Sequence, residues 1–131
     1  MNDSKSTDLS LLLLRITFGG LMLLNHGLPK LDKLMAEGPV KFADVMGLGA
    51  TNSLRLAVFS ELICAALLVL GLFTRWAAIP LVITMLVAVF MIHGGDPLAD
   101  KEHAILFLIP YIILMIKGAG WYSLDAQLLK K

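Results

Sequence analysis

The sequence predicts an all-α integral membrane protein, a four-helix bundle in which the helices run up, down, up and down. Three observations lead to this fold class. The 131 residues are 58% hydrophobic and only 16% charged, which is more apolar than an ordinary soluble domain. The apolar residues fall into four long runs, about the length that crosses a bilayer. Prolines, glycines and polar clusters separate these runs. A chain of this length predicts one transmembrane domain over residues 1–131.

We expect helices over about residues 9–28, 53–73, 75–93 and 101–117. The first should end at Pro29, because proline lacks an amide hydrogen and its ring clashes with the preceding turn. Only one or two residues join the second helix to the third, so these two must be antiparallel neighbours. Thr74 can cap the third helix. Pro110 lies inside the fourth, which breaks at Gly118.

The connection between the first two helices is long, about 24 residues over 29–52. Within it, residues 39–46 begin with a proline and place Phe42, Val45 and Met46 on one helical face. We therefore expect an interfacial amphipathic segment, a short helix that covers one mouth of the bundle. The alternative is an exposed irregular loop.

Charge and cysteine content exclude several classes of protein. The net charge is +1 and no basic block is present, so binding to nucleic acid is not expected. The single cysteine, Cys64, can form neither an intrachain disulfide nor a redox pair, and we interpret it as a small packing residue. Basic residues number six on the side of the termini and five on the other. This slim excess predicts that both termini are cytoplasmic.

Ionisable residues within apolar runs are rare and costly, which makes them candidates for function. The topology brings all of these residues except Arg15 to one half of the bundle. We predict that this half forms a polar pocket whose residues bind a ligand or handle protons. The candidates are Arg15, His26, Glu61, His93, Glu102 and His103.

The helical spacing suggests a partner for Glu61. Arg15 and His26 are 11 residues apart and therefore share nearly the same helical face, at about 100° per residue. Glu61 lies inside the second run, where an unpaired carboxylate would be expensive. We expect it either to pair with Arg15 or a histidine, or to be protonated. The alternative is that Arg15 and Glu61 form an ion pair that only fixes helix packing.

No metal site is predicted, although histidine and glutamate are metal ligands. Glu102 and His103 are adjacent and point about 100° apart, and the chain has no His-x-x-x-His or Glu-x-x-His spacing. One cysteine and the lack of a glycine-rich phosphate loop offer nothing recognisable for flavin, haem or an iron–sulfur cluster. Catalytic residues therefore cannot be assigned.

Several segments, in order along the chain, resemble the DoxX family of small four-helix membrane proteins. They are LRI at 14–16, GG at 19–20, HGLPKL at 26–31, Glu61 ahead of Ala65-Ala66, GLFTR at 71–75 and GAGWYSLD at 118–125. The chain departs from the family in one place. Many members have a GGxE segment before the last helix, whereas here residues 96–101 separate Gly95 from Glu102. The role of that glutamate is therefore not carried over.

The resemblance implies association with membrane redox systems, because relatives are linked to a thiosulfate:quinone oxidoreductase as small subunits without a cofactor of their own. The leading hypothesis is a membrane subunit that binds a quinone-like or lipid-like amphiphile and supports an oxidoreductase partner protein. On this hypothesis the chain is an accessory subunit and is not catalytic alone. The alternative is an assembly scaffold or homo-oligomer whose buried charges only fix packing. A small transporter is disfavoured, because no pair of interrupted helices occurs at matching positions in two halves.

Overall fold

The computed structural model describes residues 3–128, and within that range every regular element is helical. This confirms the predicted all-α class. Three continuous helices are long and apolar enough to cross a membrane: Ser4–Met35, Ala50–Leu70 and Thr74–Ile92. A fourth, α7 (Leu98–Lys117), has 20 residues and carries Asp100, Lys101 and Glu102 in its first turns. The last described element is a short helix, α8 (Leu124–Leu128), that the sequence did not predict.

The first helix runs past Pro29, so the prediction that it ends there is wrong. It is built from α1 (Asp3–Leu14), η1 (Arg15–Gly19), α2 (Gly20–Met22), η2 (Leu23–Gly27) and α3 (Leu28–Met35). The η segments are wider π-helical turns. Pro29 lies in the first turn of α3, directly after one of them. There the ladder of i to i−4 hydrogen bonds is already interrupted, so proline costs less than in a regular helix interior.

The second and third helices contain π-helical turns of the same kind. The second consists of α4 (Ala50–Val58), η3 (Phe59–Cys64) and α5 (Ala65–Leu70). The third consists of α6 (Thr74–Val87) and η4 (Ala88–Ile92). The predicted amphipathic helix over 39–46 is absent, because that segment is irregular coil. Its chain direction is set by turns with positive φ at Gly38, Met46 and Gly47, which are incompatible with a right-handed helix.

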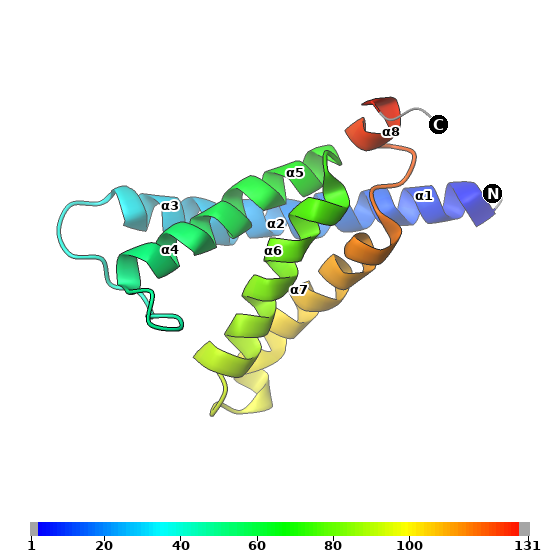
Figure 1. Cartoon of the computed structure of the whole chain (residues 1–131). Helices are drawn as coiled ribbons and strands as arrows, with labels where there is room; N and C mark the ends of the chain where they lie inside the picture. Colours follow the sequence, from blue (N-terminus) through cyan, green and yellow to red (C-terminus); the bar gives the residue numbers. More distant parts are fainter. Residues whose placement is uncertain (1–2, 129–131) are drawn as a thin grey trace.

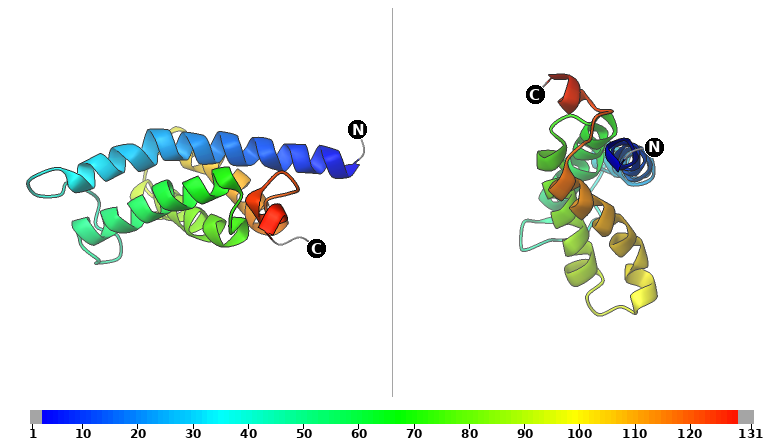
Figure 2. Two further views of the ribbon diagram at one scale, coloured as in Figure 1. Left: turned by 90° about the horizontal axis from the view of Figure 1, so that it is seen from above. Right: turned by 90° about the vertical axis from the view of Figure 1, so that its right-hand side faces the viewer.

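The helices form two antiparallel pairs (Figure 1). One pair is the first helix with α4–α5, and the other is α6–η4 with α7. The pairs meet near the turn between α5 and α6 and diverge away from it (Figure 1). The start of α1 and the helix α8 lie at the same end of the molecule (Figure 2). The pocket described below lies in the diverging half.

The end of the chain is attached to the turn between α5 and α6. The two carboxylate oxygens of Asp125 accept hydrogen bonds from the backbone amides of Phe73 at 2.7 Å and Thr74 at 3.0 Å. Its own amide donates to the carbonyl of Gly71 at 2.8 Å. Asp125 therefore caps α6, and the prediction that Thr74 does so is wrong. A residue 51 positions away supplies the cap, which short-range sequence patterns cannot show.

We expect Asp125→Ala to lower the free energy of unfolding by about 0.5–2 kcal/mol, because loss of a helix cap costs that much. The exposed Asp32 provides the control, since its carboxylate has no partner among the described residues. Asp32→Ala should leave thermal unfolding in detergent unchanged. Equal melting temperatures for the two variants would contradict the capping role.

Candidate functional site

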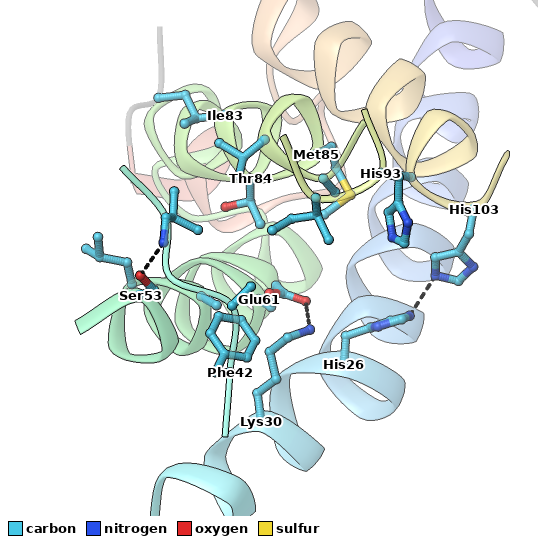
Figure 3. A pocket seen from close by; sticks show the side chains of 18 of the residues that line it. His26, Lys30, Phe42, Ser53, Glu61, Ile83, Thr84, Met85, His93 and His103 are labelled. Carbon is cyan, nitrogen blue, oxygen red and sulfur yellow. Dashed lines mark hydrogen bonds and ion pairs between the residues drawn. The ribbon is translucent and has the colours of Figure 1, made fainter. Parts of the chain in front are cut away.

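A cavity of about 410 Å³ lies between the diverging helix pairs. Most of its lining is aliphatic, with a few polar side chains that come from different helices (Figure 3). Volumes of 300–1,000 Å³ with apolar walls and a few convergent polar groups are typical of small-molecule sites. The chemistry-bearing residues in the lining are His26, Lys30, Ser53, Glu61, Thr84, His93, Asp100 and His103.

Helical spacing explains how two walls of the pocket are built. On the first helix, Met22, His26 and Lys30 follow one another at intervals of four, and all three line the cavity. On the second, Ser53, Ala57 and Glu61 do the same. Residues four apart lie on the same side of a helix. Each helix therefore presents one stripe to the cavity, and each stripe ends in a charged side chain.

Glu61 and Lys30 form an ion pair inside this cavity. The Lys30 Nζ atom lies 2.6 Å from Oε1 of Glu61, and Glu61 is only 4% exposed. Among the described residues no group hydrogen-bonds to its second oxygen, Oε2, yet that oxygen is not sealed from open space. Glu61 lines the cavity, so the site contains a buried carboxylate with one oxygen free to accept a further hydrogen bond.

Gly27 allows this pair to form, because it brings the first helix into backbone contact with η3. A Cβ atom at Gly27 would lie 2.3 Å from the carbonyl oxygen of Glu61 and 2.9 Å from the Cα atom of Leu62. Only a residue without a side chain permits this approach. Lys30 follows one turn later on the same helix and so reaches Glu61 directly.

Two histidines contact each other across the pocket wall. The Nε2 atoms of His26 and His103 are 2.7 Å apart (Figure 3). One ring must donate and the other accept, so at most one extra proton is compatible with this hydrogen bond. The third histidine, His93, also lines the cavity, and its Nδ1 atom lies 2.8 Å from a carboxylate oxygen of Asp96.

The structure brings together four of the five residues predicted to share a pocket: His26, Glu61, His93 and His103. Glu102 is not among them. It is exposed and lies on another face of α7, beside Leu98 and Leu106. Since neighbouring helical residues point about 100° apart, His103 faces the cavity and Glu102 cannot.

Arg15 is not the partner of Glu61, and that prediction is wrong. Its guanidinium is 1% exposed and hydrogen-bonds to backbone carbonyls near the end of α5, those of Leu68 at 3.3 Å and Val69 at 3.2 Å. It also donates to the carbonyls of Ala119 and Tyr122 in the segment before α8. Carbonyls at a helix C-terminus attract cations. Arg15 therefore fixes the packing at the end of the bundle opposite the pocket.

Sequence reasoning missed Lys30, the actual partner of Glu61. The signal was present, because Lys30 lies four residues after His26 and therefore on the same helical face. A helix that ended at Pro29 would place Lys30 outside that face, and this is why the prediction omits it. Asp100, which lines the cavity near His103, was missed as well.

The pocket has partly exposed aliphatic walls and a covering segment. Leu56 of α4 and Ile83 of α6 line it and are 57% and 54% exposed, respectively. The coil containing Phe42 and Met46 also contributes to the lining, and the amide of Val45 donates to the Ser53 hydroxyl at 2.9 Å. Within residues 3–128, no group of three or more histidine, cysteine or acidic side chains could hold a metal ion.

Comparison with known proteins shows which family the sequence matches. The family model DoxX matches residues 10–94. An uncharacterized protein of Haemophilus influenzae is 32% identical over 99% of this chain and 98% of its own length. An uncharacterized membrane protein of Mycobacterium tuberculosis is 31% identical over 86% of this chain and 77% of its own length. No solved structure matches the chain.

Proposed function

The chain belongs to the DoxX family of integral membrane proteins, and on that basis we propose that it binds a quinone-like or lipid-like amphiphile inside the membrane. The observation that carries the proposal is the cavity around Glu61, where an accessible carboxylate oxygen stands within apolar walls. Charged side chains within membrane-spanning helices mark functional sites by default. The head group would lie at the Glu61–Lys30 pair.

The arrangement of the walls supports an amphiphile over a small polar solute. The Glu61 end offers hydrogen-bonding groups, whereas Leu56 and Ile83 contribute partly exposed aliphatic walls. An amphiphile can satisfy both ends, because its tail is as apolar as the surrounding lipid. Entry from the bilayer between α4 and α6 would require no passage through water.

We further propose that the chain is an accessory subunit of a quinone-linked oxidoreductase in the bacterial inner membrane, with both termini cytoplasmic. The partner would supply the redox cofactor. What supports this is the resemblance of the sequence to family members with such partners, together with the slim excess of basic residues on the side of the termini.

Ala57→Trp tests the binding proposal, because Ala57 is 8% exposed and its side chain lines the cavity. The indole should fill the pocket and abolish saturable binding of decylubiquinone to the purified protein in lipid nanodiscs. Ile109→Trp is the matched control, because Ile109 is 52% exposed and does not line the cavity. It should bind as the parent protein does.

Equal binding by the parent protein and both variants would contradict the proposal and place the probe in the surrounding lipid. Complete absence of saturable binding, to decylubiquinone or to a neutral lipid, would leave the scaffold hypothesis. In that case the Glu61–Lys30 pair would serve helix packing alone, as Arg15 does at the other end of the bundle.

A further inference from the structure

We infer that the pocket selects amphiphiles with an uncharged head group that forms hydrogen bonds, and that it discriminates against anionic head groups. This inference rests on the proposed function and names the ligand class of the same site. It follows from the charges that line the cavity, from the hydrogen-bonding positions that remain open, and from the state of the histidine pair.

The fixed charges of the lining do not favour an anion. Among the described residues of the lining, Lys30 is the one lysine or arginine, against the carboxylates of Glu61 and Asp100. The nearby lysines face elsewhere. Lys33 lies over the ring of Phe42, with Nζ 5.8 Å from the ring centroid, and Lys101 donates to the carbonyl of Gly94. Neither lines the cavity.

Lys30 is already engaged by Glu61. A carboxylate or phosphate that approached its ammonium group would also approach Glu61 Oε1, which lies 2.6 Å from Nζ. Like charges repel strongly where water is excluded. An incoming anion would therefore have to displace a buried carboxylate, for which the described part of the lining offers no second lysine or arginine.

The positions left open suit a neutral head group. Glu61 Oε2 can accept a hydrogen bond from a hydroxyl. Lys30 uses one of its three ammonium hydrogens for Glu61, so it can still donate to a carbonyl or ether oxygen. Ser53 accepts from Val45 and retains its own hydroxyl hydrogen as a donor.

The histidine pair can carry at most one positive charge, so together with Lys30 it can balance but not outweigh the carboxylates of Glu61 and Asp100. His26 faces Lys30 on its own helix and His103 on α7, and all three line a cavity that also contains Glu61, His93 and Asp100. The 2.7 Å contact between the two Nε2 atoms requires one bare nitrogen. The pair thus supplies hydrogen-bonding groups without two positive charges.

Chain-matched probes test the inference. Monolaurin and laurate share one acyl chain but carry a neutral glycerol head and a carboxylate, respectively. We expect native mass spectrometry of the protein to show that monolaurin binds about ten-fold more tightly than laurate, because the carboxylate meets Glu61 at low dielectric. Ala57→Trp should abolish monolaurin binding.

Laurate binding that is as tight as monolaurin binding, and lost in Ala57→Trp, would overturn the selectivity but not the proposed function. No Ala57-dependent binding of either probe, together with none of decylubiquinone, would overturn the proposed function itself.

Charge variants provide the second arm of the test. Glu61→Gln removes the repelling carboxylate and frees Lys30, so the preference for monolaurin over laurate should shrink or reverse. Asp100→Asn offers a milder change at an exposed position and should shift the preference in the same direction, even if Glu61→Gln does not fold. An unchanged preference in Asp100→Asn and in any folded Glu61→Gln protein would overturn the inference.

Discussion

Replacement of Gly27 by alanine is expected to destabilise the protein and to separate Lys30 from Glu61. The new methyl group would lie 2.3 Å from the Glu61 carbonyl oxygen and 2.8 Å from the carbonyl carbon. Both atoms belong to the backbone, so no side-chain rotation can relieve the clash and the two helices must move apart. Overpacking of this kind costs about 1–3 kcal/mol. Thermal unfolding in detergent, with decylubiquinone binding measured in parallel, would record both effects.

Gly20→Ala is the matched control for this substitution. Gly20 lies two turns earlier on the same helix, and a Cβ atom there would have no neighbour within 4 Å. Alanine should be neutral at Gly20, or stabilise by about 0.5–1 kcal/mol through its higher helix propensity. If Gly27→Ala unfolded at the same temperature as Gly20→Ala, the close contact between the first helix and η3 would be refuted.

The second large effect is expected from breaking the Glu61–Lys30 pair on one side only. Lys30→Met or Glu61→Gln should each destabilise the protein, because removal of one partner from a buried ion pair costs about 3–5 kcal/mol. The double variant should recover much of that loss, since no uncompensated charge remains. The measurement is a double-mutant cycle of unfolding free energies in detergent.

The exposed pair of His93 and Asp96 serves as the reference for this cycle. Its side chains are 38% and 47% exposed, so Asp96→Asn should change stability by less than about 1 kcal/mol. Additive losses in the Lys30 and Glu61 variants would contradict a direct interaction. A double variant that regains stability but not decylubiquinone binding would separate the role of the pair in the site from its role in folding.

The lengths of the apolar runs and the antiparallel connectivity were enough to predict the helices and the half of the bundle where the polar residues meet. Each of His26, Glu61 and His103 lies in the corresponding half of its helix, and antiparallel packing brings those halves together. These features could not show which cation pairs with Glu61. Arg15 and His26 share a face, but 11 residues separate them, which is about 16 Å along the helix axis. A common face thus did not bring Arg15 within reach of Glu61.

Two further errors came from local rules that the wider structure overrides. Pro29 does not end its helix, since a π-helical turn precedes it, and Lys30 therefore lies on the same helix as His26 rather than in a loop. Residues 39–46 have an amphipathic pattern but remain coil. Their apolar side chains are placed by glycine turns and by the bond between Val45 and Ser53. The expectation that this segment lies over the polar half still agrees with its place in the pocket lining.

The most direct test of the central claim, an intramembrane pocket that holds an amphiphile with its head group at Glu61, is photo-crosslinking in lipid nanodiscs. The probe would be a monoacylglycerol with a diazirine in its acyl chain, and peptide mapping would locate the label. The structure predicts labelling of the pocket-lining residues Leu56, Ala57, Ile83 and Thr84 that excess monolaurin suppresses and Ala57→Trp abolishes. Labelling confined to the lipid-facing side chains of Leu106 and Ile109, and unaffected by competitor, would contradict it.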